Sequence, residues 1–219
     1  MVRPPLAAAT IIGVTGGVGT GKSTVARMFG IRLKAPVLDA DQITHRLMRP
    51  SSPVWRRIRA RFGKGVIASS GEIDRRRLGK ITFGDPKKLE TLCEIIHPAV
   101  RRWIQGELKK IRRSQPRTRV ILDIPLLIEA GSAYPLDFLV VVSAPLKVVA
   151  QRLKKRSGWT LREVKRRQGF QLPLREKERL ADFVVDNGGT LEAARRQVSK
   201  ICFNALQDFN ALHKTVQEN

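Results

Sequence analysis

A glycine-rich segment near the N-terminus restricts the possible folds of this chain more than any other feature. Residues 16–23 read GGVGTGKS and match the pattern G-x-x-x-x-G-K-[ST] in full. A short apolar run, residues 11–14, precedes the segment and a helix-like pattern follows it. Backbone N–H groups of such a loop bind phosphate together with the N-terminus of the following helix. The segment therefore predicts a nucleoside triphosphate site between a strand and a helix.

Individual residues of this segment have expected roles. The glycines let the backbone turn tightly and bring successive N–H groups toward a phosphate. Lys22 would reach the β- and γ-phosphates, and the Ser23 hydroxyl would ligate Mg²⁺. A glycine-rich turn that binds nothing is the alternative, but it gives no reason for a lysine beside a serine here. The residues expected to bind the nucleotide, ATP, are Gly17, Val18, Gly19, Thr20, Gly21, Lys22, Ser23 and Thr24.

The motif alone does not separate kinases from GTPases, ATPases and helicases. The chain has no Asn-Lys-x-Asp sequence that would read guanine, and it has no clear second signature of the transporter or helicase kind. The short length of 219 residues also favours a kinase that acts on a small molecule.

Five short apolar runs predict buried strands, because each run is continuous rather than alternating. Each run leads into a polar residue, and helix-like segments separate them. This order predicts an α/β fold, with βαβ units that build a P-loop core of about five parallel strands. Ligands of such sheets bind at the carboxyl ends of the strands. The runs are residues 11–14, 37–38, 120–122, 138–142 and 183–185.

One long segment does not fit the alternation of strands and helices. Residues 44–118 are mostly helical in pattern. Ser52 followed by Pro53 predicts the start of one helix, and further helices are expected near residues 86–96 and 98–113. We interpret the segment as an inserted, helical substrate-binding subdomain.

The basic helical stretch between the fourth and fifth apolar runs has the position of a lid. A last helix is expected to begin near Thr190 and to pack on the sheet. The predicted parts of the chain are an N-terminal extension (1–10), a P-loop core (11–43, 119–151 and 181–219), the substrate subdomain (44–118) and the lid (152–180).

Acidic residues follow two of the predicted strands. Asp39 and Asp41 come after the second run, where a carboxylate could orient a hydroxyl acceptor or take its proton. Capping of the next helix is the alternative for either residue. Asp123 ends the third run and could support Mg²⁺ through water, or it could cap a loop.

These motifs together resemble the dephospho-CoA kinase family. The resemblance begins with residues 15–23, 39–41 and the Asp-Ile-Pro-Leu-Leu-Ile-Glu sequence at 123–129, which is much more specific than the phosphate loop. It covers about residues 11–190. Further matching elements, in the inserted domain, the lid and the last strand, are Phe62-Gly63, 71–75, Phe83, His97-Pro98, Gln171, Lys177, 181–182 and 186–189.

The resemblance implies transfer of the ATP γ-phosphate to the ribose 3′-hydroxyl of 3′-dephospho-CoA, which gives CoA and ADP. It implies that Asp41 is the base or orienting carboxylate and that Lys22 and Arg152 face the phosphates, with Arg156 and Arg167 of the lid as weaker candidates. ATP and Mg²⁺ are the implied cofactors, with Ser23 and Asp123 as metal ligands. The implied substrate contacts are Asp39, Asp41, His97, Asp123 and Glu129.

Structural alternatives exist for several of these residues. His97 could be a packing residue, Glu129 could pair with an arginine, and Arg152 could be a solvated helix charge. The chain departs from the family pattern in the lid, with residues 157–158 where an acid is common and Phe170 where a small residue is usual. These departures concern lid contacts and leave the reaction itself unaffected.

The net charge of +23 exceeds what a kinase of this kind needs. Such a surface attracts polyanions without sequence preference. A nucleic-acid-binding P-loop protein is therefore one rival interpretation, and a kinase for another nucleotide or a sugar is a second. An arginine-rich lineage with mostly solvated charges would explain the same composition.

Other features bound the location and assembly of the chain. Cys93 and Cys202 lie far apart, which favours a reducing, cytoplasmic setting without disulfides. No apolar run approaches the ~20 residues that a membrane span requires. The N-terminus does not read as a signal peptide. We expect a small-molecule substrate, nonspecific polyanion binding at most, no membrane association, and a monomer or a small homo-oligomer.

Overall fold

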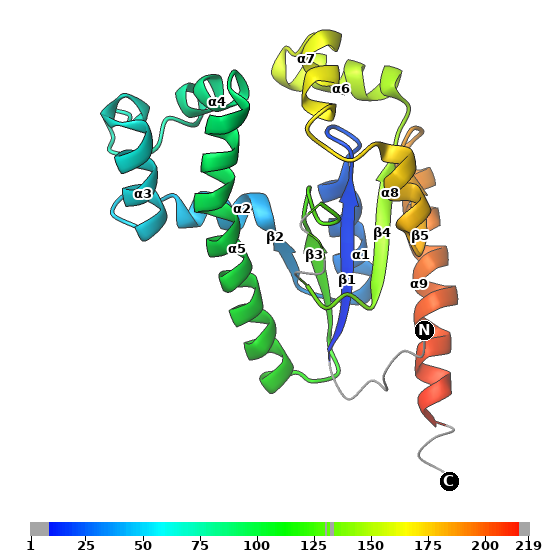
Figure 1. Cartoon of the computed structure of the whole chain (residues 1–219). Coiled ribbons are helices and arrows are strands. Elements are labelled where there is room, and N and C mark those ends of the chain that lie inside the picture. The colour runs from blue at the N-terminus through cyan, green and yellow to red at the C-terminus, as the bar shows by residue number, and fades with distance from the viewer. Residues whose placement is uncertain (1–8, 130, 132–133, 215–219) are drawn as a thin grey trace. The chain divides into compact units, whose positions relative to one another are not determined.

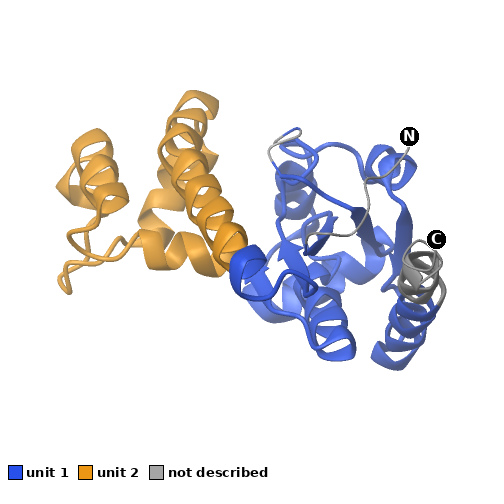
Figure 2. Cartoon of the chain, turned by 90° about the horizontal axis from the view of Figure 1, so that it is seen from below, with its two compact units in different colours: residues 1–39, 111–219 blue, residues 40–110 orange. Residues whose placement is uncertain are grey.

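The structure, a computed structural model, describes residues 9–129, 131 and 134–214. The chain forms two compact units, coloured separately in Figure 2, which are residues 1–39 with 111–219 and residues 40–110. We call the first the core unit and the second the helical unit. Most of the expected N-terminal extension lies outside the described residues, and Thr10 already belongs to the first strand.

The core unit contains a parallel sheet of five strands in the order β2-β3-β1-β4-β5 (Figure 1). All five predicted strands are confirmed, each within one or two residues of the expected bounds. The central position of β1 places the phosphate loop in the middle of the sheet edge. The strands are β1 (Thr10–Gly16), β2 (Val37–Asp39), β3 (Arg119–Asp123), β4 (Phe138–Ser143) and β5 (Phe183–Asp186).

Two helices cover one face of this sheet. The side chains of Val25 and Phe29 from α1 (Lys22–Leu33) and of Val198 from α9 (Leu191–Lys214) join the buried core cluster of the strands. The expected last helix is confirmed, and the Thr190 hydroxyl accepts the N–H of Ala193 at its start. On the other face, α8 (Leu174–Leu180) contacts β4 (Figure 1). This covering on both faces explains why the strands are continuously apolar.

The helices α6 (Leu146–Ser157) and α7 (Leu161–Gln168) pack against the phosphate loop. Val149 and Leu153 of α6 and Val164 of α7 form a small buried cluster, and Val18 of the loop packs against it. The beginning of the segment expected to form the lid therefore shares apolar contacts with the nucleotide site.

The helical unit has a hydrophobic cluster of its own. It is built from α2 (Ala40–Leu47), α3 (Pro53–Phe62), a short 3₁₀ turn, α4 (Arg75–Phe83) and the first part of α5 (Pro86–Ser114). The predicted start of α3 is confirmed: the Ser52 hydroxyl oxygen accepts the N–H of Trp55 at 3.0 Å. This unit overlaps the expected substrate subdomain.

The expectation of two helices at 86–96 and 98–113 is wrong, because α5 is one helix of 29 residues with Pro98 inside it. Proline removes one backbone hydrogen bond, at a cost of ~3 kcal/mol in a helix interior. The buried stripe of Ile95, Val100 and Ile104 continues across the proline and offsets that cost.

Among the helices of the described residues, none is long and apolar enough to cross a membrane.

Replacement of Pro98 by alanine is predicted to stabilise the chain. It restores a helix hydrogen bond and removes a clash, so the free energy of unfolding should rise by ~1–3 kcal/mol. Gly106→Ala in the same helix is a matched control, because a Cβ at Gly106 meets no atom within 4 Å; its expected gain is ~1 kcal/mol. Urea denaturation measures both. A gain in Gly106→Ala without one in Pro98→Ala would show that the lost bond is already replaced.

Candidate nucleotide-binding site

The phosphate loop requires glycine at two places for steric reasons. Gly19 and Gly21 have φ values of +77° and +88°, in the left-handed region that favours glycine. A Cβ on Gly19 would lie 2.7 Å from a methyl group of Leu153, and one on Gly21 would collide with the side-chain amide of Asn187. The loop is thus held tightly by α6 and by the segment that follows β5.

Asn187 is a member of the site whose role sequence reasoning missed. Its side chain is 3% exposed, and its Nδ2 atom donates to the carbonyl oxygen of Thr20 at 2.7 Å. The Thr20 hydroxyl in turn donates to the carbonyl oxygen of Gly17 at 2.9 Å. These two bonds fix the loop from both sides. The available signal was the position of Asn187 directly after a strand, at the edge of the sheet where ligands bind.

Asp123 and Lys22 form the charged centre of the site. The Lys22 Nζ atom lies 3.3 Å from Oδ1 of Asp123, whose side chain is 1% exposed. Burial raises the pKa of the Asp123 carboxyl, and the nearby Asp39 adds to the effect; Lys22 and a hydrogen bond from Ser23 act in the opposite direction. Burial therefore outweighs the stabilisation that Lys22 and Ser23 give to the charged carboxylate.

This centre fits a magnesium ion. Asp123 Oδ1 is buried and faces Lys22 Nζ at 3.3 Å as an ion pair without a well-aligned hydrogen bond, and the Ser23 hydroxyl lies beside the same carboxylate. Mg²⁺ keeps several waters and needs only one or two protein oxygens besides the phosphates. It does not require a cage of three or more His, Cys, Asp or Glu side chains, and the described part of the chain has none.

Arg152 brings a second cation to the loop. It lies on α6, and its Nη1 atom would be 3.9 Å from a Cβ on Gly21. This atom is buried and lacks a hydrogen-bond partner among the described residues. A buried guanidinium nitrogen without a hydrogen-bond partner is costly, and an anion at the loop would satisfy it. The position of Arg152 thus favours a phosphate contact over a solvated helix charge.

The other basic candidates of the lid have different surroundings. The Arg167 guanidinium lies 4.0 Å from the ring centroid of Trp159, and its Nε atom donates to Glu163 at 3.0 Å. Arg156 is exposed in the last turn of α6. Arg167 is therefore held by packing inside the segment, whereas Arg156 faces solvent.

Glu129 is held by protein groups in the core unit. One of its carboxylate oxygens lies 2.8 Å from Nζ of Lys177 and accepts the N–H of Leu172 at 2.9 Å. Glu129 therefore forms an ion pair, as one of the two alternatives predicted, but its partner is a lysine and not an arginine.

The remaining candidates lie at the ends of β2 and on α5. Asp39 pairs in register with Asp123, so the two acids share one edge of the sheet. Asp41 lies in the first turn of α2, where a carboxylate is favoured by the helix dipole. Desolvation and, second, Arg101 lower the pKa of His97 on α5, so its imidazole is neutral at pH 7.

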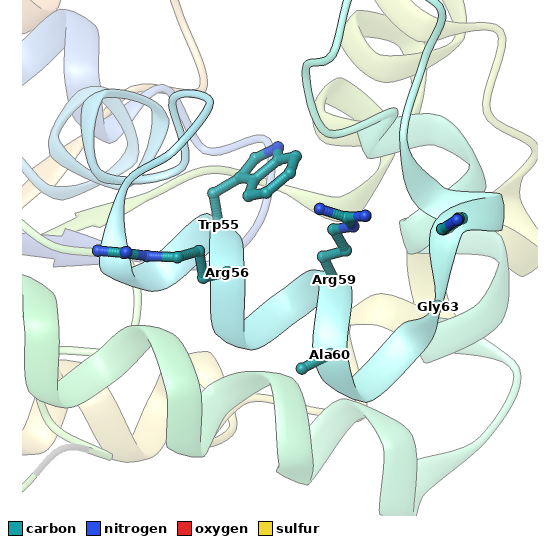
Figure 3. A pocket seen from close by; sticks show the side chains of 6 residues that line it. Trp55, Arg56, Arg59, Ala60 and Gly63 are labelled. Carbon is teal, nitrogen blue, oxygen red and sulfur yellow. The ribbon is translucent and has the colours of Figure 1, made fainter.

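A separate depression lies on α3 in the helical unit (Figure 3). It has a volume of about 360 Å³, and its lining includes Trp55, Arg56, Arg59 and Lys64. The Trp55 indole N–H donates to the carbonyl oxygen of Gly71, and the Arg59 guanidinium lies 5.4 Å from the ring centroid. Sequence reasoning did not identify this basic surface as a site.

Comparison with known proteins decides between the kinase families. The family model for dephospho-CoA kinase matches residues 10–193. The chain belongs to the dephospho-CoA kinase family. It is 41% identical to the dephospho-CoA kinase of Geobacillus kaustophilus over 203 residues, which cover 93% of this chain and 98% of that protein. The dephospho-CoA kinase of Leifsonia xyli is also 41% identical, over 87% of this chain and 96% of its own length.

Solved structures share the fold of this chain. A crystal structure of a Thermus thermophilus protein is 34% identical, has a TM-score of 0.75, and covers 91% of this chain and 98% of that one. The dephospho-CoA kinase of Campylobacter jejuni, at 24% identity and a TM-score of 0.63, shows the shared fold. The resemblance and the P-loop α/β fold expected from the sequence are both confirmed.

Asp123→Asn is predicted to separate stability from activity. The raised pKa means that the folded state holds this proton more tightly than the unfolded chain does. As the pH rises from 3.8 through the raised pKa, the unfolded chain releases this proton more readily than the folded state does. The free energy of unfolding therefore falls over that pH range. At pH 7 the variant should unfold no earlier than the parent protein, while ATP-dependent turnover should fall on the order of 10²-fold.

Thermal unfolding and turnover with saturating Mg²⁺ measure the two effects. Glu192→Gln is a suitable control, because Glu192 makes two long, exposed ion pairs on α9, with Arg195 and Arg196, and both quantities should stay unchanged. An Asp123→Asn protein that is much less stable but fully active would contradict this account of the buried carboxylate.

Proposed function

We propose that the chain transfers the γ-phosphate of ATP to the 3′-hydroxyl of the dephospho-CoA ribose and releases CoA and ADP, the final step of coenzyme A synthesis. The observation that carries the proposal is the family match over residues 10–193 combined with an intact charged centre, in which Lys22 and Asp123 meet at 3.3 Å beside the phosphate loop.

The residues of the core unit would act by positioning and by neutralising charge. The Val18 N–H is donated to Gln171, so other N–H groups of the loop and the N-terminus of α1 would bind the phosphates. Lys22 and Arg152 offset the negative charge that the transferred phosphoryl group spreads over its oxygens. Because Lys22 is already paired with Asp123 at 3.3 Å, it needs little reorganisation during the reaction.

Ser23 and Asp123 would hold Mg²⁺ at this centre. When bound, the ion would neutralise the negative charge that develops on the phosphates. The raised pKa of Asp123 gives this role a pH dependence, since a protonated carboxyl is a poor ligand. Metal affinity should therefore weaken at a higher pH than an ordinary aspartate would allow.

We propose Asp41 as the carboxylate that orients the acceptor hydroxyl or takes its proton. It follows β2 by two residues and lies in the first turn of α2, and a positioned carboxylate can accept a hydroxyl proton. Asp39 and His97 are proposed substrate contacts. Glu129 is paired with Lys177, so we propose that it affects substrate binding indirectly, by fixing the position of the segment 172–177.

The segment 152–180 is proposed to close over bound ATP. Closure would exclude water, so that the phosphate passes to the acceptor and is not lost to hydrolysis. Turnover of ATP without an acceptor should therefore be slow.

The substrate assignment has a direct test. ADP release would be followed with ATP and Mg²⁺ in the presence of dephospho-CoA, with adenosine, AMP and shikimate as parallel acceptors, and CoA would be identified by mass. Rapid turnover with dephospho-CoA alone is expected. Turnover with another acceptor but not with dephospho-CoA would contradict the assignment and retain only the kinase class.

Asp41→Asn is predicted to lower kcat by about 10²- to 10⁴-fold, the usual contribution of a general base, and to leave the KM for ATP nearly unchanged. Glu94→Gln removes an exposed carboxylate from α5 and provides the matched control. Full turnover by the Asp41 variant would remove this residue from the mechanism.

The basic surface of α3 favours a weak additional property, nonspecific binding of polyanions. Residues 42–71 contain seven Lys or Arg and no Asp or Glu, and the depression around Trp55 lies within this stretch. Binding of single-stranded DNA should fall steeply with salt and should not stimulate ATP turnover.

Both cysteines are free, one of them buried in the core unit, which supports the proposed cytoplasmic setting.

A further inference from the structure

The segment from Gln171 to Lys177 is bonded to two separate parts of the nucleotide site. The Gln171 Oε1 atom accepts the backbone N–H of Val18, inside the phosphate loop, at 3.0 Å. One residue later, the N–H of Leu172 donates to a carboxylate oxygen of Glu129 at 2.9 Å. Two consecutive residues thus contact the loop after β1 and the turn after β3.

Lys177 completes the connection at the other end of the segment. Its side chain is fully buried, and its Nζ atom lies 2.8 Å from Glu129 and 3.5 Å from the carbonyl oxygen of Pro125. The Thr15 hydroxyl donates to the same carbonyl oxygen at 3.0 Å. The Pro125 carbonyl therefore receives hydrogen bonds both from the end of β1 and from α8.

A lysine at 0% exposure needs a specific reason, because burying an ammonium group costs several kcal/mol unless it is well paired. An aliphatic side chain would fill the same space at lower cost. The lysine instead joins Pro125 and Glu129, which lie on the turn that begins at Asp123. The bonds of this segment thus reach both halves of the site without touching the reacting groups.

We propose that Gln171, Glu129 and Lys177 form a latch that sets the phosphate loop and the turn at 123–129 in their working geometry. The three are positioning residues: Gln171 engages the Val18 amide, and the Lys177–Glu129 pair holds the turn that carries Asp123. Since Gln171 belongs to the segment proposed to close over ATP, the latch also ties movement of that segment to the shape of the loop. The proposal deepens the proposed kinase function and rests on it for the reaction.

The central test compares two substitutions of Gln171. Gln171→Met keeps the size of the side chain but loses the acceptor for the Val18 N–H, so affinity for MgATP should fall about 2- to 10-fold, the value of one hydrogen bond. Gln171→Glu keeps an acceptor oxygen but places a negative charge beside the phosphates. Its activity relative to the parent protein should rise as the pH falls and the new carboxyl is protonated.

Gln168→Met is the matched control, because this half-buried glutamine lies three residues earlier, at the end of α7, and carries no assigned role. MgATP affinity is measured by calorimetry without any acceptor, so the result does not depend on dephospho-CoA being the substrate. If the parent protein shows no turnover with dephospho-CoA, the proposed function is overturned, but the latch is still tested by the MgATP affinities.

The expected result is a loss of MgATP affinity in Gln171→Met that Gln168→Met does not share, together with the pH-dependent recovery of Gln171→Glu. Equal MgATP affinity in the two methionine variants, with at most a lower unfolding temperature for Gln171→Met, would overturn the latch. So would a Gln171→Glu protein whose activity relative to the parent is constant with pH.

Discussion

A buried carboxylate and a lysine meet at the edge of the sheet, and the rest of the core unit is arranged around that pair. The contact between Asp123 and Lys22 exists because β1 and β3 are adjacent and parallel, so both strands end at the same edge of the sheet. Burial makes the carboxylate costly, as its raised pKa shows. Arg152, which has a buried and unpartnered nitrogen, lies beside the same loop. The buried carboxylate favours a divalent cation and the unpartnered arginine nitrogen favours an anion, so the site suits a ligand that combines phosphates with a divalent cation.

Much of the fold could be predicted because its signals are local. The strands are continuous apolar runs, the cap of α3 is a serine followed by a proline, and the phosphate loop is one contiguous motif. The central acids were also predictable, because the ends of parallel strands meet at one edge. Lys22, Ser23 and Asp123 therefore lie together as the spacing along the chain indicated.

Sequence reasoning placed Asn187 and Gln171 among the elements that match the family, but it missed the bonds that they make over long separations along the chain. Asn187 bonds the loop from 167 residues away, and Gln171 does so from 153. No local pattern specifies which polar side chain after a strand will meet which amide. Pro98 was misread for the opposite reason: a local rule predicted a helix break, but the tertiary packing of α5 outweighed it. The identity of the partner of Glu129 likewise depended on the fold.

The central claim is that the buried charges of the core unit are arranged for the phosphates of a nucleotide, and ligand-dependent thermal unfolding tests it most directly. The unfolding midpoint would be measured with Mg²⁺ and equal concentrations of adenosine, AMP, ADP or ATP, since a ligand that binds only the folded state raises the midpoint more the more tightly it binds. The account predicts little effect of adenosine and a clear increase from AMP to ADP and ATP. Equal stabilisation by adenosine and ATP would show that the site recognises the base rather than the phosphates and would contradict the account.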